Sequence, residues 1–104
     1  MRLARALLAA CGLLASAAAP AQQPGRAVYE SVCSACHAVE NVMVSAPKLG
    51  ARKDWQQRLQ RAGGLDGLVR NAANGVGAMP ARGGRDDLDE AQLKAAIRYM
   101  MQAD

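Results

Sequence analysis

The sequence is organised around five residues, Cys33-Ser34-Ala35-Cys36-His37. Two cysteines three positions apart, with a histidine directly after the second, form the C-x-x-C-H motif through which c-type haem is attached. On one helical turn, thiols at i and i+3 lie on the same face, where they can add to the two vinyl groups on one edge of a porphyrin. The motif therefore predicts one covalent haem c held by Cys33 and Cys36, with His37 as an axial ligand of the iron.

Other uses of paired cysteines fit the sequence less well. A thioredoxin-type redox pair is expected within a βαβ pattern, which this chain does not show. A structural zinc site needs four ligands, whereas the chain beyond its leader offers two cysteines and one histidine. A chance occurrence in a cytosolic protein is the remaining alternative, and the N-terminal sequence argues against it.

The N-terminal segment has the layout of an export signal. Met1–Arg5 is short and basic, residues 6–18 are mostly apolar, and Ala19-Pro20-Ala21 forms an A-x-A cleavage site. This order is typical of a secretory signal peptide, and it predicts a leader over residues 1–21, cleavage after Ala21 and a periplasmic protein. A membrane span needs about 18 apolar residues, and Cys11 comes too early for lipoprotein processing. Stable membrane insertion after cleavage is therefore not expected.

The remaining segment, residues 22–104, is long enough for one small domain. Loss of Arg2 and Arg5 with the leader lowers the formal net charge from +4 to +2. Nucleic acid is not an expected partner, because the chain has neither a basic stripe nor interleaved aromatic residues. A domain this small, with Trp55 and two tyrosines as its only aromatic residues, has little apolar mass for a core. A buried porphyrin would supply it.

Hydrophobic periodicity predicts an all-α domain of about four helices wrapped around the haem, since no alternating strand pattern of useful length is present. The expected helices cover residues 26–36, 52–62, 65–73 and the segment after 89. Between them we expect loops over residues 38–50 and 76–85. Gly63-Gly64 would end the second helix, and Asn74-Gly75 is suited to a left-handed C-terminal cap on the third.

The last helix has the clearest beginning. Asp89 and Gln92 have the spacing of a capping box, and Leu88 and Leu93 have the spacing of a hydrophobic staple. An apolar face follows at helical spacing. Its members are Leu93, Ala96, Ile97, Met100 and Met101.

Several methionines could supply a thioether to the second axial position of the iron. Met43 follows soon after His37 and is poorly placed to cross the haem plane. Met100 and Met101 lie on the apolar face of the last helix, where methionines usually fill the core. Met79 lies in a glycine-rich loop, far enough along the chain to pass around the ring. From the residues alone, ordinary packing explains Met79 equally well.

Taken together, the motifs resemble the class I c-type cytochromes, and in particular the bacterial cytochrome c5 group. The matching positions are Gly25, Tyr29, the C-x-x-C-H motif, Ala46–Gly50, Trp55, Arg58, Asn74-Gly75, Ala78–Pro80, Gly83-Gly84 and Leu93–Met100. The resemblance implies the small all-α fold of that class, with Gly25 and Tyr29 crossing Tyr99. It departs in one respect: Arg85 and Leu88 stand where c5 proteins often carry an additional disulfide.

The resemblance also implies roles for single residues. Met79 matches the axial methionine of the family. The backbone carbonyl of Pro47 would accept a hydrogen bond from the ring N–H of His37, which fixes the ligand's orientation. Trp55 and Arg58, one helical turn apart, would reach a haem propionate with an indole N–H and a guanidinium group.

Histidine and methionine ligation favours electron transfer, because both axial positions are filled and the thioether favours the reduced iron. We therefore expect a soluble mono-haem electron carrier, for example of a respiratory chain, and not an enzyme. One alternative is a haem domain with a labile Met79 that acts as a gas sensor or weak peroxidase, although the chain has no second histidine to serve it. Another is a cytochrome subunit of a larger oxidoreductase.

The expected partners are redox proteins, one donor and one acceptor, bound transiently by a monomer. Residues 42–44 and 78–80 would form an apolar rim at the haem edge. The basic residues expected around this rim are Lys48, Arg52, Lys53, Arg82 and Arg85. Such a surround favours an acidic partner through electrostatic steering, although scattered solvated charges explain the same residues.

Overall fold

The computed structural model describes residues 9–13 and 23–103. The predicted cleavage site and most of the predicted leader lie outside the described residues. None of the described helices is long and apolar enough to cross a membrane.

The described chain is built from helices joined by loops. Its elements are α1 (Arg26–Val28), a π-helical turn (Tyr29–Cys33), α2 (Ser34–His37), α3 (Arg52–Ala62), α4 (Leu65–Asn74), a 3-10 segment (Ala81–Gly84) and α5 (Glu90–Gln102). Apart from these, the described part contains one isolated bridge, between Val76 and Met79. The all-α prediction is therefore confirmed, and the expected helix positions hold to within a residue or two.

α1, the π-helical turn and α2 follow one another without a break and together form the first helix of the domain. The sequence pattern did not predict its π-helical turn. Within it the backbone N–H of Ser34 donates to the carbonyl of Tyr29, five residues back. The carbonyl of Glu30 accepts instead from the hydroxyl of Ser34, at 2.9 Å. The wider turn shifts the phase of the helix just where it enters the C-x-x-C-H motif.

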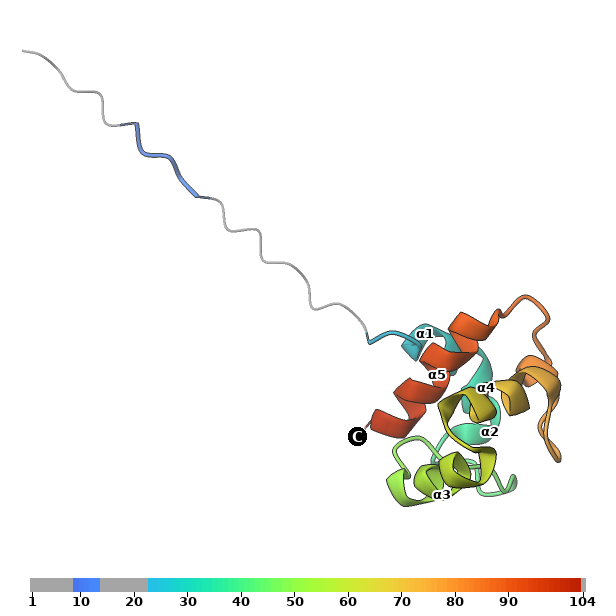
Figure 1. The fold of residues 1–104 in the computed structure, drawn as a ribbon. Helices are drawn as coiled ribbons and strands as arrows, with labels where there is room; N and C mark the ends of the chain where they lie inside the picture. The colour runs from blue at the N-terminus through green and yellow to red at the C-terminus, as the bar shows by residue number, and fades with distance from the viewer. Residues whose placement is uncertain (1–8, 14–22, 104) are drawn as a thin grey trace, which may run out of the picture.

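The first helix crosses α5 at close range (Figure 1). Gly25, at the start of α1 with φ 87°, lies against the backbone of α5. A Cβ at this position would be 2.1 Å from the carbonyl oxygen of Ala95, so only glycine fits. Beside it the rings of Tyr29 and Tyr99 pack with their centroids 5.4 Å apart. This confirms the predicted crossing.

Glycines also set the corner between α3 and α4. Gly63 is left-handed (φ 77°, ψ 25°), and the N–H of Gly64 donates to the carbonyl of Leu59 at 2.9 Å, as in a Schellman motif. Gly67 lets α4 approach α3, because a Cβ there would lie 1.8 Å from the carbonyl oxygen of Ala62. The predicted left-handed cap at Gly75 was wrong: its φ of 85° is positive, but its ψ of 150° leads the chain away extended.

The capping box predicted for α5 is present. Asp89 accepts from the backbone N–H of Gln92 at 2.7 Å, and the side chain of Gln92 accepts from the N–H of Asp89 at 2.9 Å. The staple residues Leu88 and Leu93 are both buried in the core. The face that α5 buries consists of Leu93, Ala96, Ile97 and Met100.

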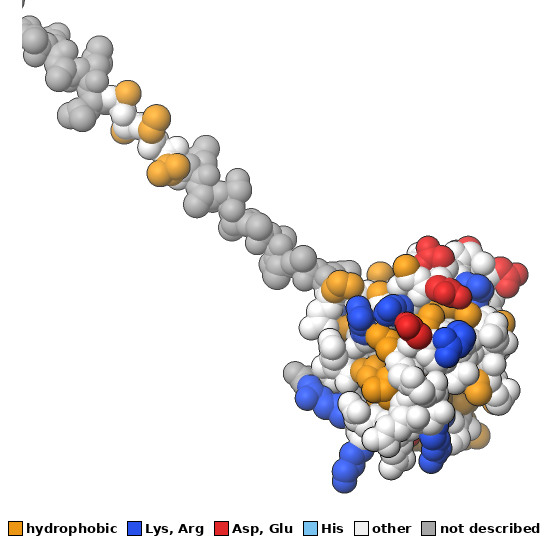
Figure 2. All heavy atoms as spheres, viewed as in Figure 1, with side chains coloured by type: hydrophobic (Ala, Val, Ile, Leu, Met, Phe, Trp, Pro, Cys, Tyr) orange, Lys and Arg blue, Asp and Glu red, His pale blue; other side chains and the backbone are white. Residues whose placement is uncertain are grey.

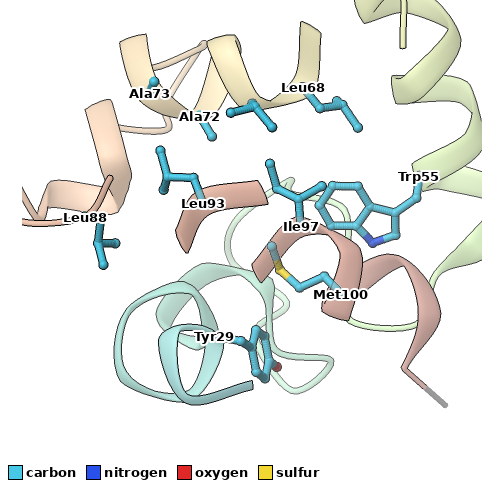
Figure 3. Close-up of a cluster of buried hydrophobic side chains, with 10 residues drawn as sticks. Tyr29, Trp55, Leu68, Ala72, Ala73, Leu88, Leu93, Ile97 and Met100 are labelled. Carbon is cyan, nitrogen blue, oxygen red and sulfur yellow. The ribbon is translucent and has the colours of Figure 1, made fainter. Parts of the chain in front are cut away.

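The core lies where α3, α4 and α5 meet the first helix. Figure 3 shows Trp55 from α3 directed toward Ile97 and Met100 of α5, with Leu68 and Ala72 of α4 above Ile97. Tyr29 closes the cluster from the first helix. The three long helices therefore surround a space into which the C-x-x-C-H helix also faces.

Candidate haem site

The helices and the loops between them line a cavity of about 440 Å³. Both motif cysteines, His37 and Met79 are among its lining residues. The apolar part of its wall includes Val32, Leu68, Ala72, Leu93, Ile97 and Met100. A volume in the range of cofactor pockets, about 300–1,000 Å³, lined by apolar side chains and by two thiols, an imidazole and two thioethers, fits a haem.

The two cysteines are half-buried and form no disulfide. They bracket the junction between the π turn and α2, with Cys33 ending the turn and Cys36 in the last turn of α2. Burial raises the pKa of the Cys33 thiol to about 11, so this thiol is protonated at neutral pH. Both side chains line the cavity, as thioether formation with a bound porphyrin requires.

His37 is only 8% exposed, at the end of α2. Its Nδ1 lies 2.7 Å from the carbonyl oxygen of Pro47, the hydrogen bond that the family resemblance implied. Because a carbonyl can only accept, the ring proton is on Nδ1, and Nε2 carries a free lone pair. Burial lowers the pKa of His37, the Pro47 hydrogen bond opposes this, and the positive charges of Lys48 and Arg58 lower it further. The imidazole is therefore in the neutral form that a metal ligand needs.

Trp55 supports His37 instead of reaching into the cavity with its N–H. Its ring stacks on the imidazole, with centroids 5.9 Å apart and planes at 20°. Its indole N–H donates to the carbonyl of Lys48 at 2.9 Å. This backbone carbonyl is the partner of the indole N–H in the structure, and the contact of this N–H with a propionate stays a prediction. Arg58 does line the cavity, with its Nε 3.3 Å from Asp54.

The loop after His37 supplies partners to the last carbonyls of α2. The side-chain amide of Asn41 donates to Ala35 O at 2.6 Å, and the ammonium of Lys48 donates to Cys36 O at 2.8 Å. The N–H of Leu49 donates to the carbonyl of His37 at 2.9 Å. We did not predict these roles for Asn41 and Lys48. The one signal in the sequence is that polar side chains follow a helix end whose carbonyls need donors.

Met79 belongs to a tight turn on another part of the cavity wall. Val76 and Met79 exchange backbone hydrogen bonds of 3.1 and 2.9 Å, and Gly77 within the turn has φ 56°. Met43 is 90% exposed and does not line the cavity, whereas Met100 is buried and does. The cavity thus offers two thioethers, Met79 from a loop and Met100 from α5.

The loop after Met79 is tied by a side chain, at one of the two positions where the c5 resemblance would place a disulfide. Arg82 adopts a left-handed conformation (φ 56°, ψ 28°), unusual for a residue with a side chain. Its guanidinium donates to the carbonyl of Leu88, and the Leu88 side chain is 5% exposed. Arg85, the other expected cysteine position, forms a 2.6 Å ion pair with Asp87.

The expected basic surround of the rim is only partly present. The Lys48 ammonium is used by backbone carbonyls, Arg82 by Leu88, and Arg85 by Asp87. Arg52 and Lys53 are exposed at the start of α3. Figure 2 shows acidic side chains, with basic ones between them, at the upper right of the domain, near the segment that leads into α5. The exposed acidic residues of that segment are Asp86, Asp87, Asp89 and Glu90.

Sequence comparison finds c-type cytochromes. The profile of a family described as "Cytochrome C oxidase, cbb3-type, subunit III" matches residues 20–100. Cytochrome c5 of Azotobacter vinelandii is 40% identical over 76 residues, which cover 73% of this chain and 89% of the relative. Cytochrome c-555 of Chlorobaculum tepidum is 37% identical over 81 residues, covering 74% of this chain and 71% of the relative.

Comparison with solved structures gives the same family. A chain in the crystal structure of an electron transfer complex of nitrite reductase with cytochrome c is 42% identical, with a TM-score of 0.64. The match covers 77% of this chain and 93% of that one. The cofactor of this family is a covalently bound haem c, which the cavity and its cysteine pair fit. Since sequence and fold agree over most of the segment that follows the predicted leader, the chain belongs to the class I c-type cytochromes and resembles cytochrome c5.

Proposed function

We propose that this protein is a mono-haem electron carrier, which passes single electrons between redox proteins through a haem c ligated by His37 and Met79. The observation that carries the proposal is that both candidate axial ligands line the same cavity as both attachment cysteines. When bound, the haem supplies an iron that gains and loses one electron. With both axial positions filled there is no open site for a substrate, so we propose no enzymatic activity.

The protein's own groups support this role in distinct ways. The Pro47 carbonyl holds the proton on Nδ1 of His37 and so keeps Nε2 free to act as ligand. The Met79 thioether is a soft ligand that favours the reduced state. The apolar lining from α4 and α5 keeps water away, which also favours the less charged, reduced state. Arg58, at the cavity wall, is the proposed partner of a propionate.

The test is an optical and electrochemical comparison of three haem-loaded proteins: wild type, Met79→Ala and Met43→Ala. The oxidised wild type should show a weak long-wavelength sulfur-to-iron charge-transfer band and a reversible one-electron couple. Met79→Ala should lose the band and show a lower midpoint potential. Met43→Ala removes the same side chain from a 90% exposed position outside the cavity and should match the wild type.

Two results would contradict the proposal. If the band survives in Met79→Ala but is lost in Met100→Leu, the buried methionine of α5 is the ligand. If the wild type is high-spin and its spectrum shifts on addition of CO or NO, the iron is open. In that case the gas-sensor or peroxidase function replaces the electron carrier.

For the partner and compartment, we propose a periplasmic protein, exported by the leader over residues 1–21 and cleaved after Ala21. One relative of known structure was solved in an electron transfer complex with nitrite reductase, and we propose a comparable transient complex of a monomer with a reductase or a donor. The exposed Val42, Met43, Ala78 and Pro80 supply an apolar rim for it. N-terminal sequencing of the exported protein tests the cleavage, which predicts Gln22 as the first residue.

The description of the matching family favours a second candidate, a subunit of a larger oxidoreductase. A carrier should elute as a free monomer from a gently prepared periplasmic extract. Stoichiometric co-elution with an oxidase or reductase subunit would favour the second candidate instead.

A further inference from the structure

Lys48 was expected among the basic residues around the rim, but its ammonium points inward and contacts two backbone carbonyls. Its ammonium lies 2.8 Å from the carbonyl oxygen of Cys36 and 2.7 Å from that of Val44. The first carbonyl belongs to α2 and the second to the loop that follows it. One charged group therefore closes the loop back onto the helix that carries both cysteines and His37.

The backbone of the same residue is held as well. The carbonyl of Lys48 accepts from the indole of Trp55, whose ring stacks on His37. The residue before it, Pro47, accepts the His37 ring proton, and the residue after it, Leu49, donates to the His37 carbonyl. The segment 47–49 thus touches both the ring and the backbone of His37, and Lys48 is the residue that ties this segment to α2 and to the loop.

A lysine is chemically suited to this position. The ammonium has three donors and no acceptor, and here two carbonyls accept from it. A positive charge at the C-terminus of a helix also interacts favourably with the partial negative charge of the terminal carbonyls.

We propose that Lys48 is a positioning residue for His37: by tying Cys36 O to Val44 O, its ammonium holds the loop closed and keeps the Pro47 carbonyl on the imidazole. The proposal rests on the proposed function of His37 as an axial ligand. It does not require Lys48 to touch the haem. It predicts that loss of the ammonium disturbs the ligand's orientation and the redox properties of the protein, although the coordinating atoms are unchanged.

The test compares haem-loaded Lys48→Met with Lys53→Met. Both substitutions remove one ammonium, but Lys53 is exposed on α3, and the two carbonyls at Cys36 and Val44 accept from Lys48. Amide hydrogen exchange at the Leu49 N–H, which donates to His37 O, should be at least about tenfold faster in Lys48→Met, because two hydrogen bonds to a charged group are lost. The hyperfine-shifted ring protons of His37 should move in the oxidised protein, and the midpoint potential should fall.

Two further variants separate the tether from the charge. Lys48→Arg keeps the cation and several donors, and it should restore most of the exchange protection. Lys48→Gln offers a shorter, neutral amide group as donor and should lie between wild type and Lys48→Met, which keeps the test open if Lys48→Met does not accumulate. The proposal is overturned if Lys48→Met or Lys48→Gln retains the wild-type exchange rate and ring shifts, or if Lys53→Met changes them equally. A wild type without a reversible one-electron couple would instead refute the carrier function and leave the exchange comparison intact.

Discussion

The two candidate ligands of the iron are held in different ways. On the His37 side, the ring is buried, stacked on Trp55 and bonded to Pro47, and the loop beyond it supplies donors to the end of α2. On the Met79 side, the ligand lies in a turn between glycines of positive φ, and its neighbours Ala78 and Pro80 are exposed. One charged side chain, Arg82, ties this second loop.

The His37 loop is held by more local contacts than the Met79 loop, and the place of each residue in the chain explains why. The histidine is attached to the helix that carries both cysteines, so its orientation is set once by dense local bonding. The methionine comes from a segment remote in sequence that must wrap around the ring. Local stability follows buried apolar contact and protected hydrogen bonds. We therefore expect the Met79 loop to open before the His37 loop does.

The largest effect is expected from Trp55→Ala. It removes a side chain that is 4% exposed, together with the donor to Lys48, and should lower the free energy of unfolding by about 3–5 kcal/mol. Denaturant unfolding of the haem-loaded protein, followed by far-ultraviolet circular dichroism, measures this. Trp55→Phe keeps the packing of a ring and should lose only about 1–2 kcal/mol, through the unpaired carbonyl.

On the Met79 side, the truncation to compare with Trp55→Ala is Val76→Ala, in the turn that contains Met79. Val76 is 52% exposed, so its truncation should change stability by less than about 0.5 kcal/mol. The contrast between the two sides would be refuted if Val76→Ala were as destabilising as Trp55→Ala.

An intermediate effect is expected at Arg82, which combines a tether with a left-handed backbone. Arg82→Met removes the hydrogen bond to Leu88 and retains the backbone strain, so it should lower the free energy of unfolding by about 1–2 kcal/mol. Arg82→Gly loses the same bond but relieves the strain, and it should be about 1 kcal/mol more stable than Arg82→Met.

Ligand exchange at the iron tests directly whether loss of the Arg82 hydrogen bond makes the Met79 loop open more easily. Binding of added imidazole to the oxidised protein requires Met79 to leave, and it should tighten by about tenfold in Arg82→Met, following the loss of loop stability. Lys48→Met, on the histidine side, should leave imidazole affinity within about twofold of wild type. Equal increases in both variants would show that the two loops open together.

The smallest effect is expected for Asp87→Ala, compared with Asp89→Ala two residues along. Arg85 lowers the pKa of Asp87, so any stabilisation is present above the ordinary carboxyl pKa and is lost as pH falls through the lowered value. Because both partners are exposed and screened, Asp87→Ala should leave the melting midpoint at pH 7 unchanged. Asp89→Ala removes the cap of α5 and should lose about 1 kcal/mol. A larger loss in Asp87→Ala would mean that the ion pair helps to hold the Met79 loop.

The sequence alone determined those features that depend on neighbours along the chain. The helix that carries the C-x-x-C-H motif, the beginning of α5 at Asp89 and the bounds of α3 were predicted correctly, because spacing and capping are local properties. The family resemblance added the hydrogen bond from His37 to Pro47 and the packing of Tyr29 on Tyr99, which the structure contains. Met79 as ligand stays a prediction, placed on the cavity wall.

The tertiary structure alone decided how polar groups pair across the fold. The indole of Trp55 bonds to Lys48 and not into the cavity, Lys48 turns inward from the rim, and Arg82 reaches Leu88. Each of these depends on which backbone carbonyls lack a partner once the helices have packed, and buried carbonyls must find a donor. A sequence shows where the donors are. Only the folded chain shows which acceptors lie within their reach.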